Sequence, residues 1–425
     1  MKVIIVGAGF AGLKLARKLA HHKMEVLLID KNNHHQFQPL FYQVASANLE
    51  PSSISFPLRK VFQDTSNVRI RVAEVLNTIS EQNLLRTNIG DFKYDMLVIA
   101  TGATTNFFGN ANIEKFAFPM KSTVEAVKLR QHILENFEEA TFATEERKKS
   151  LFNIVIAGGG ATGVELAGSL AEMKKNILPK DYPDFDYQLV NIYLIEGGDA
   201  TLAPMSIASQ QKSKKYLEAM GVKILLQTRV KEYDGQTVLL SNGQAIASNT
   251  LIWSAGIKGN VLEGLTSAKI ERGNRIKVDR NCKLVGYENI FAIGDIAYME
   301  TEKYQQGHPQ LANVATSQAG YLADFFKDGK NVHPFEYHDK GTMATVGKNK
   351  AVVDLPFVSF QGFFAWIIWM FLHVLLLMGM KNRVQVFINW VYAYFTNDSS
   401  LRLIFQNLYK KPKAVVEENV ISPII

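Results

Sequence analysis

Two glycine clusters in this chain have the spacing that lets backbone N–H groups surround a pyrophosphate. The first reads Gly7-x-Gly9-x-x-Gly12 and follows a short apolar run. In such a loop the first glycine permits a tight turn, the second admits a phosphate, and the third lets a helix pack on a strand, with its N-terminus facing the anion. Asp30 ends the next apolar run, where its carboxylate can accept hydrogen bonds from a ribose. This cluster predicts a dinucleotide site, with a ligand-free turn as the weaker alternative.

The second cluster repeats this arrangement in the middle of the chain. Gly158-Gly159-Gly160-x-x-Gly163 follows another apolar run, and Glu196 closes the strand expected next. A carboxylate there accepts from ribose hydroxyls and repels a 2′-phosphate. Because glycines rather than an arginine follow Glu196 directly, the sequence favours NADH over NADPH at this site.

Each glycine cluster lies inside a strand–turn–helix–strand unit. Short apolar runs before glycines are typical of buried parallel strands, and apolar residues at helical spacing follow each turn. The elements expected are strands at 3–6, 25–30, 153–157 and 189–195, and helices at 11–23 and 164–176. The fold class predicted is α/β, with two Rossmann-like dinucleotide-binding domains.

Three later apolar runs end in small or acidic residues. They cover 94–100, 250–254 and 289–293, and lead into Thr101-Gly102, Ala255-Gly256 and Gly294-Asp295. A late strand ending at Asp295 would place a carboxylate beside an FAD on the N-terminal unit, and the middle unit would then deliver a nicotinamide. The alternative for Gly294-Asp295 is a strand end with a turn and no ligand.

The order of these units predicts an FAD domain that is interrupted by an NADH domain. The boundaries expected are 1–115 and 266–340 for the two parts of the FAD domain, 116–265 for the NADH domain, and 341–425 for a membrane-associating region. The charged stretch 145–149 is expected to be a linker, and the stretch 177–188, with two prolines, a loop.

Positive charge and apolar length are concentrated in the C-terminal region. The 425-residue chain has a net charge of +7, and residues 340–413 hold nine Lys/Arg against two Asp/Glu. Residues 357–380 contain no charged side chain, a length that could span a bilayer. A buried core helix, a spanning helix and an in-plane pair of helices on anionic lipid through residues 355–413 are the alternatives. The in-plane pair is favoured because tryptophans and lysines suit an interface, whereas lysines beside long apolar runs disfavour nucleic acid.

The chain resembles the type II NADH:quinone oxidoreductases, the single-subunit alternative NADH dehydrogenases of the two-dinucleotide flavoprotein superfamily. The resemblance covers nearly the whole chain. It rests on Val6-Gly-Ala-Gly-Phe-Ala-Gly12, Phe37-Gln-Pro-Leu-Phe-Tyr-Gln-Val44, Ala100-Thr-Gly102, Gly158-Gly-Gly-Ala-Thr-Gly-Val-Glu-Leu-Ala167, Ala255-Gly256 and Phe291-Ala-Ile-Gly-Asp295. It implies FAD bound non-covalently, NADH as the donor, a membrane quinone as the acceptor, and no metal.

The resemblance also implies positions for the site residues. FAD contact is expected for Gly7, Gly9, Gly12, Asp30, Ala100, Thr101, Gly102, Gly294 and Asp295, and NADH contact for Gly158, Gly160, Gly163, Glu196, Ala255 and Gly256. Glu165 matches the family's carboxylate near the nicotinamide, where it would orient the ring or assist proton movement. Its alternative role is that of a first-turn glutamate favoured by the helix dipole.

The sequence departs from the family beside the flavin. Many members carry Ala-Gln-x-Ala-x-Gln at the quinone pocket, whereas this chain has Ala312-Asn-Val-Ala-Thr-Ser317, followed by Gln318. Asn313 and Ser317 replace both glutamines, and their amide and hydroxyl can still hydrogen-bond a carbonyl. These two residues and Gln318 are the expected quinone-side residues, and a changed headgroup preference is the alternative.

The single cysteine, Cys282, excludes the dithiol relay of disulfide reductases and sulfide:quinone oxidoreductases. The function predicted is a peripheral enzyme on the cytoplasmic face of the cell membrane, which passes two electrons from NADH through FAD to a membrane quinone without proton pumping. One alternative is a soluble acceptor, suggested by Asn313 and Ser317. Another is a non-enzymatic redox-sensing membrane scaffold. A homodimer is compatible with the sequence.

Overall fold

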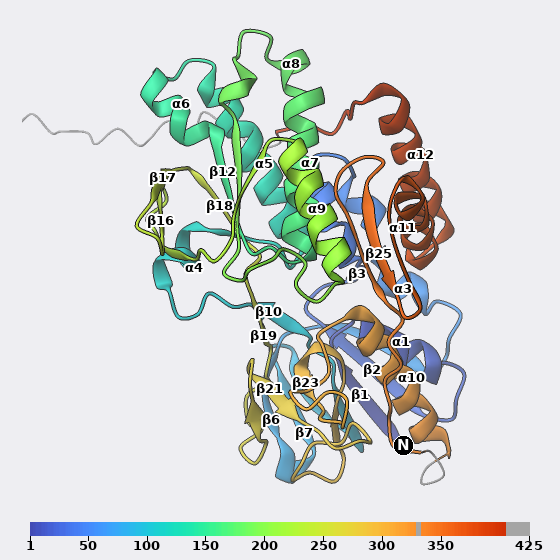
Figure 1. The fold of residues 1–425 in the computed structure, drawn as a ribbon. Helices are drawn as coiled ribbons and strands as arrows, with labels where there is room; N and C mark the ends of the chain where they lie inside the picture. The colour runs from blue at the N-terminus through green and yellow to red at the C-terminus, as the bar shows by residue number, and fades with distance from the viewer. Residues whose placement is uncertain (329–332, 405–425) are drawn as a thin grey trace, which may run out of the picture.

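The computed structural model describes residues 1–328 and 333–404, and a parallel sheet forms the centre of its lower half (Figure 1). The strand order is β22 (Ile290–Ala292), β9 (Met96–Ile99), β1 (Lys2–Val6), β2 (Glu25–Asp30) and β5 (Val68–Val72). Val3 on β1 lies opposite Met96 on one side and Val26 on the other. The four consecutive residues from Val3 to Val6 are all buried, so both faces of the sheet are covered.

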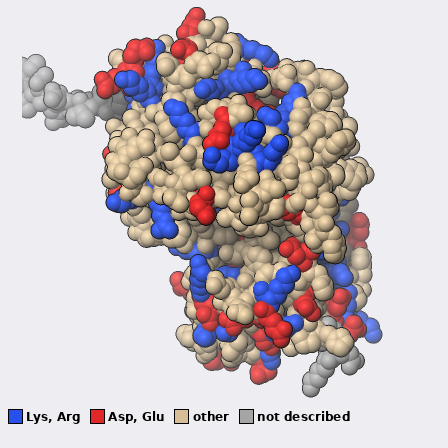
Figure 2. All heavy atoms as spheres, in the orientation of Figure 1, with Lys and Arg blue, Asp and Glu red and all other residues tan. Residues whose placement is uncertain are grey.

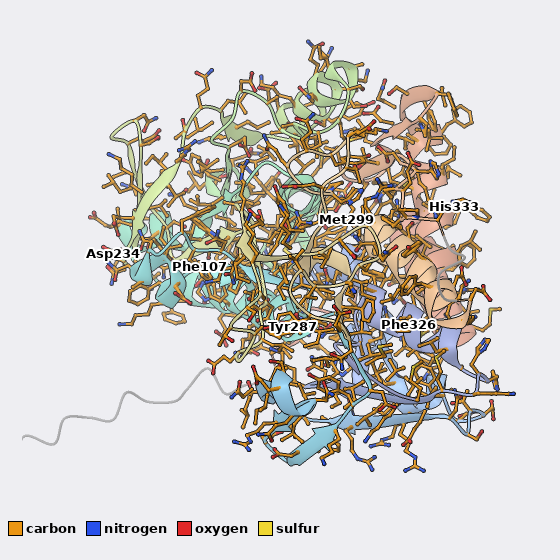
Figure 3. The ribbon with its side chains drawn as sticks, turned by 90° about the horizontal axis from the view of Figure 1, so that it is seen from below. Phe107, Asp234, Tyr287, Met299, Phe326 and His333 are labelled. Carbon is orange, nitrogen blue, oxygen red and sulfur yellow. The ribbon has the colours of Figure 1, made fainter. Side chains whose placement is uncertain are left out.

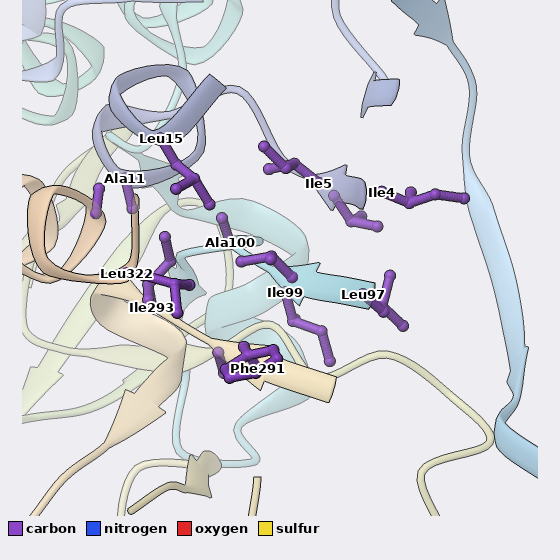
Figure 4. Close-up of a cluster of buried hydrophobic side chains, with 14 of the residues drawn as sticks. Ile4, Ile5, Ala11, Leu15, Leu97, Ile99, Ala100, Phe291, Ile293 and Leu322 are labelled. Carbon is purple, nitrogen blue, oxygen red and sulfur yellow. The ribbon is translucent and has the colours of Figure 1, made fainter. Parts of the chain in front are cut away.

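The helices α1 (Phe10–Leu19) and α10 (Ala312–Asp328) pack against each other beside this sheet. Figure 4 shows Leu15 of α1 and Leu322 of α10 in one apolar cluster with side chains of the strands. The sequence predicted that α1 would reach residue 23, but the helix ends at Leu19. The reason is that His21 has φ 65°, a left-handed conformation that a continuing helix does not allow.

A second parallel sheet forms the upper half. Its order is β11 (Phe118–Pro119), β18 (Thr250–Trp253), β12 (Asn153–Ala157), β13 (Asn191–Ile195) and β14 (Val222–Leu225). The helices of this half are α5 (Thr123–Ala140), α7 (Ala161–Asn176) and α9 (Ile207–Ala219) (Figure 1). Each half therefore contains a strand, a glycine turn and a helix in sequence, and the predicted α/β class with two Rossmann-like units is confirmed.

The chain passes between the halves through β10 (Ala103–Thr105) and β19 (Ile257–Gly259), which pair in antiparallel register (Figure 1). Figure 3 shows Asp234, between β15 and β16, at the outer edge and the buried Met299 in the interior. Smaller elements complete the halves: β3 (His34–Gln36), α2 (Phe41–Ala45), β4 (Ser55–Pro57), α3 (Leu58–Val61), β6 (Val75–Ile79), β7 (Leu84–Thr87), β8 (Gly90–Lys93), α4 (Ala111–Phe116), β15 (Val230–Tyr233), β16 (Thr237–Leu240), β17 (Ala245–Ala247), β20 (Ile270–Glu271), β21 (Arg275–Lys277) and β23 (Ala297–Tyr298).

Two connecting stretches are more ordered than the sequence predicted. The linker expected at 145–149 is wrong, because these residues begin the helix α6 (Glu145–Phe152). The side chain of Thr144 caps this helix by accepting the N–H of Arg147, and two glutamates occupy its first turn. The loop expected at 177–188 contains the short helix α8 (Leu178–Asp181), which starts with a proline in its first turn.

The C-terminal region begins with an antiparallel sheet of β24 (Thr342–Thr345), β25 (Ala351–Leu355) and β26 (Val358–Gly362), followed by α11 (Phe363–Leu376) and α12 (Met380–Thr396). The uncharged run 357–380 is therefore not one helix. Gly362 and Gly379, with φ 96° and 81°, begin the two helices in conformations that favour glycine. Nowhere in residues 1–328 and 333–404 does a helix combine the length and apolar character needed to cross a bilayer.

The helices α11 and α12 share a core with the upper half. Trp369 of α11 and Trp390 of α12 are buried in one apolar cluster with residues of α2, α5 and α7. The strand β25 packs between α9 and α11 (Figure 1). The C-terminal region is thus part of the folded body, even though one side of its helices is open to solvent.

Candidate functional site

The first glycine loop is closely packed on one side and open on the other. A Cβ on Gly7, which has φ +101°, would lie 2.3 Å from the oxygen of Ala100, and one on Gly12 would lie 1.9 Å from the oxygen of Gly7. These two glycines are therefore required by the turn and by the close packing of α1. At Gly9 a Cβ would meet no atom within 4 Å, so this side of the loop is open for a ligand.

Asp30 lies beside this opening, at the end of β2. Its Oδ2 accepts the N–H of Ala8 at 2.6 Å, and its Oδ1 accepts the N–H of Asn32 at 2.7 Å. The two bonds hold the carboxylate next to the glycine loop. Each oxygen keeps a further lone pair for a ribose hydroxyl.

The end of β22 approaches the same loop. A Cβ on Gly294, which has φ +79°, would lie 3.1 Å from the Cβ of Ala11, so this turn lies against the start of α1. The neighbouring Asp295 is half-buried, and desolvation raises the pKa of its carboxyl while the positive charges of Lys121 and Arg275 oppose that rise. A carboxylate held among two cations can contact the sugar and phosphate part of a flavin nucleotide.

The remaining residues expected near the flavin lie on two elements. Thr101 donates its hydroxyl to the oxygen of Asn260 at 2.6 Å, which ties the end of β9 to the returning chain. On α10, Asn313 and Ser317 are half-buried, whereas Gln318 is buried and its Oε1 accepts the N–H of Gly294 at 2.7 Å. Gln318 thus supports the turn before Asp295.

The second glycine loop repeats the geometry of the first. A Cβ on Gly158, with φ +107°, would lie 2.6 Å from the backbone of Ser254, and one on Gly163 would lie 1.9 Å from the oxygen of Gly158. A Cβ on Gly160 would meet no atom within 4 Å. The same division between packing glycines and one open glycine indicates a second dinucleotide site.

Glu196 is fixed beside this loop by the N–H groups of Gly159 at 2.6 Å and Gly198 at 2.7 Å. Arg229, which was not predicted to be near this site, lies next to Gly197: a Cβ on Gly197 would be 3.0 Å from Nε of Arg229. This exposed arginine comes from the segment after β14, a proximity that residue spacing does not reveal.

The end of β18 completes the second site. The hydroxyl of Ser254 donates to the oxygen of Ala157 at 2.9 Å, which holds this strand end against the glycine turn. Ala255 and Gly256 follow, and a Cβ on Gly256 would lie 2.7 Å from the ring of Phe108. Gly256 therefore admits the exposed Phe108 ring at the edge of the site.

Glu165 lies on α7, buried below the second glycine loop. Desolvation raises the pKa of its carboxyl to about 8, although the N–H of Thr345, 3.4 Å from Oε1, and the indole of Trp369 oppose the rise. This carboxyl holds a proton at neutral pH. A buried acid with a pKa near the working pH suits proton transfer.

A cavity of about 120 Å³ reaches Glu165 from the side of the C-terminal helices. Aromatic side chains of α2, α11 and α12 form much of its wall: Tyr42, Trp366, Trp369, Trp390 and Tyr394. None of the expected quinone-side residues on α10 lines it. The sequence did not predict this cavity, because its walls come from segments more than one hundred residues apart.

His373, a buried residue of α11, lies beside this cavity. Its ring is stacked on Trp369 at 3.9 Å, and its Nδ1 lies 2.7 Å from the oxygen of Trp369. Burial lowers the pKa of the imidazole to about 4, so it is neutral at physiological pH.

The outer side of α11 and α12 exposes a continuous set of apolar residues. They are Phe363, Phe364, Ile367, Ile368, Phe371, Leu372, Leu375, Leu376, Met380, Val384, Phe387, Ile388, Val391, Tyr392 and Phe395. Figure 2 shows few charged atoms along this margin of the molecule. A soluble monomer rarely exposes so large an apolar patch, so this surface, called here the α11–α12 face, indicates a lipid or protein contact.

The basic residues around this face have different environments. Lys381 is exposed, whereas Arg383 donates to the oxygens of Leu375 and Leu377. Arg402 pairs with Asp181 at 2.5 Å and with Asp398 at 2.8 Å, so its charge is partly neutralised within the protein. Lys410, Lys411 and Lys413, for which the sequence predicted contact with anionic lipid, lie outside the described residues.

Two glycine-loop modules, joined by β10 and β19 and each ending beside a carboxylate, define a two-dinucleotide oxidoreductase fold. The model of the pyridine nucleotide-disulphide oxidoreductase family matches residues 1–319, and that of the NDH2 C-terminal domain matches residues 339–397. The chain belongs to the type II NADH:quinone oxidoreductase family of this class.

Individual relatives support this membership. The chain is 34% identical to the type II NADH:quinone oxidoreductase Ndh of Mycobacterium tuberculosis, over 93% of this chain and 88% of that one. It is 30% identical to a probable NADH dehydrogenase of Dictyostelium discoideum, over 92% and 88% of the two chains. The fold is similar to NDH2 from Plasmodium falciparum in complex with NADH, with a TM-score of 0.88, 21% identity, and coverage of 95% of this chain and 99% of that chain.

Proposed function

We propose that this chain oxidises NADH and reduces a membrane quinone while it is attached to a bilayer by the α11–α12 face. As a member of the family it uses FAD and NADH. FAD, when bound, supplies an isoalloxazine that accepts two electrons from NADH and passes them to the quinone. The observation that carries the proposal is the pair of open glycine loops facing carboxylates, one in each half of the fold.

The two dinucleotides divide between the loops according to the chain order. FAD is proposed at the first loop, where it would contact Gly7, Gly9, Gly12, Asp30, Ala100, Thr101, Gly102, Gly294 and Asp295. NADH is proposed at the second, with Gly158, Gly160, Gly163, Glu196, Ala255 and Gly256. This assignment is supported by Gly9 and Gly160, which have no neighbouring atom within 4 Å of a Cβ. It is also supported by the positive charges of Lys121 and Arg275 that act on Asp295. The division into 1–115, 116–265, 266–340 and 341–425 follows from this assignment.

Glu165 is proposed to hold a proton near the nicotinamide, and Asn313 and Ser317 to contact the quinone headgroup. The support for Glu165 is its burial and the raised pKa of its carboxyl. Asn313 and Ser317 lie one turn apart on α10, close to the turn of Gly294 that Gln318 supports. They are shorter than glutamine, so a quinone carbonyl must come nearer to the helix to bond both.

The membrane contact is proposed to be monotopic, on the cytoplasmic face of the cell membrane. Apolar side chains of the α11–α12 face would enter the acyl region, with Tyr392 at headgroup depth and Lys381 near lipid phosphates. Such attachment places a hydrophobic acceptor beside the protein without a spanning helix. We also propose a homodimer, which analytical ultracentrifugation in detergent would test.

The experiment that tests the activity is stopped-flow spectroscopy on the detergent-purified holoenzyme. NADH is mixed first and a short-chain menaquinone or ubiquinone analogue second, while flavin absorbance is followed. We expect rapid bleaching with NADH and rapid recovery with one of the quinones. Recovery that occurs only with soluble carriers would refute the quinone assignment, and Asn313→Gln with Ser317→Gln would then be the first variants to examine.

A further inference from the structure

One face of α7 carries a row of polar side chains that runs from the buried centre to the surface. Glu165, Ser169, Glu172 and Asn176 are spaced by four, three and four residues, which places them on one side of a helix. All four line the cavity of about 120 Å³ beside α11 and α12. The rest of the wall combines aromatic rings with further polar side chains such as Asn48 and Lys348, and within α7 this row supplies the polar groups.

The inner end of the row is Glu165, which has no ion-pair partner among residues 1–328 and 333–404. The groups that face it are Tyr42 from α2, Thr345 from β24 and Trp369 from α11, with the neutral His373 stacked behind the indole. Burial raises the pKa of Tyr42 far above its usual range, so this phenol stays protonated. Any proton that Glu165 gives up must be replaced from elsewhere.

The middle of the row is Ser169. Its Oγ lies 2.6 Å from the Oγ of Ser46 and accepts from Nδ2 of Asn48 at 2.9 Å. A hydroxyl both donates and accepts, so it can pass a proton between neighbours when it rotates. Ser169 is one helical turn from Glu165 and less than one turn from Glu172, and the cavity between them has room for water.

The outer end is Glu172, whose carboxylate accepts the N–H of Lys348. Burial raises the pKa of Glu172, and the cations Lys348, Lys350 and Lys175 oppose the rise. The ammonium of Lys348 bonds the oxygen of Tyr394 at 2.5 Å and Oδ1 of the exposed Asn397 at 2.7 Å. The row therefore opens to solvent where α12 ends.

We propose that Glu172 and Ser169 carry protons from solvent at this opening to the carboxyl of Glu165. The inference rests on the proposed function, since the proton requirement comes from quinone reduction. NADH, one proton and a quinone give NAD⁺ and a quinol, so each turnover consumes one proton beyond the hydride. Water supplies that proton, Glu172 takes it up, and Glu165 is returned to its protonated form.

The first test does not depend on turnover. Infrared spectroscopy of the holoenzyme without NADH follows the carboxylic acid band that is absent in Glu165→Gln, and its deuterium exchange is timed after transfer to D₂O. We expect exchange at least about tenfold slower in Glu172→Gln and in Ser169→Ala, within the range by which placed acid–base groups act. Glu172→Gln keeps an acceptor for the N–H of Lys348. The exposed Glu218 on α9 offers the matched control Glu218→Gln, which should exchange at the wild-type rate.

The second test uses NADH and the quinone analogue in excess. Glu172→Gln should slow steady turnover, enlarge the solvent isotope effect, and recover when a small weak acid such as imidazole is added. Exchange at the wild-type rate in both Glu172→Gln and Ser169→Ala would overturn the proton route, even if turnover is normal. Absence of any quinone-dependent turnover in the wild type would instead overturn the proposed function.

Discussion

Replacing Glu165 by glutamine should change the way stability depends on pH. The carboxyl is buried on α7, and its pKa is raised from 4.5 to about 8 in the folded protein. Below the pKa of Glu165 in the unfolded chain, both the folded and the unfolded state hold the proton, so the residue does not lower the free energy of unfolding. As the pH rises toward the folded value, the unfolded chain releases the proton and the folded chain retains it. The contribution of Glu165 to the free energy of unfolding therefore falls as the pH rises from its unfolded to its folded pKa, and it stays constant above the folded pKa.

The size of this loss follows from the two pKa values. Each tenfold difference in proton affinity corresponds to about 1.4 kcal/mol, so the separation from 4.5 to about 8 gives an upper bound of about 5 kcal/mol. Glu165→Gln removes the titration and keeps an acceptor for the N–H of Thr345. The variant should match the wild type at acidic pH and exceed it at alkaline pH, by up to about 10 °C in Tm for a cooperative unit of roughly 200 residues.

The assay is thermal unfolding of the holoenzyme in detergent, measured for both proteins at about pH 4 and about pH 8.5, on either side of the titration. The exposed-surface variant Glu218→Gln serves as the control, and its Tm difference from wild type should stay the same at both values. If the difference between Glu165→Gln and wild type is also independent of pH, Glu165 is ionised in the folded protein. The reasoning about its proton would then be refuted.

Three further outcomes are expected. Gly163→Ala should abolish NADH binding and lower Tm, because the added Cβ has no room beside the oxygen of Gly158. Gly160→Ala should raise the KM for NADH without changing Tm, because this glycine has no neighbouring atom within 4 Å of a Cβ. Equal Tm values for the two variants would contradict the packing argument. Glu196→Ala should raise kcat/KM for NADPH relative to NADH, since it removes a carboxylate near the ribose, and an unchanged ratio would place the ribose elsewhere. Phe364→Ser should weaken binding to phosphatidylglycerol-containing vesicles by roughly 30-fold, from about 2 kcal/mol of lost apolar burial. The equally exposed Phe142→Ser should bind normally, and a similar loss there would exclude a specific face.

The sequence predicted those parts of the fold that depend on local backbone requirements. Gly7 and Gly158 form turns with positive φ at the ends of apolar strands, and such turns can be recognised from a few residues. The strand at 25–30 was predicted with the bounds that the structure shows. The helix α6 was missed although Thr144 and the two glutamates after it are an N-terminal signal, because its charged composition was interpreted as a linker.

Features that depend on distant segments could not be predicted in this way. The cavity beside Glu165 needs α2, α7, α11 and α12 together, and no spacing along the chain relates them. The pairing of Arg402 with Asp181 joins residues 221 positions apart. The division of the apolar run 357–380 was in principle visible at Gly362 and Gly379, but its lack of charge fits a single helix equally well.

The burial of Trp369 and Trp390 against α2 and α7 means that the helices α11 and α12, for which we propose the membrane contact, are not a detachable anchor. A chain shortened before β24 would uncover the apolar sides of α7 and α9 and would open the cavity around Glu165 to water. Solubility without detergent should instead be sought by placing polar residues at outward positions such as Phe364, Phe371 and Phe395, which contribute little to the interior. Substitutions on the outer side of α11 and α12 should thus impair membrane binding alone, whereas substitutions on their inner side should impair the fold.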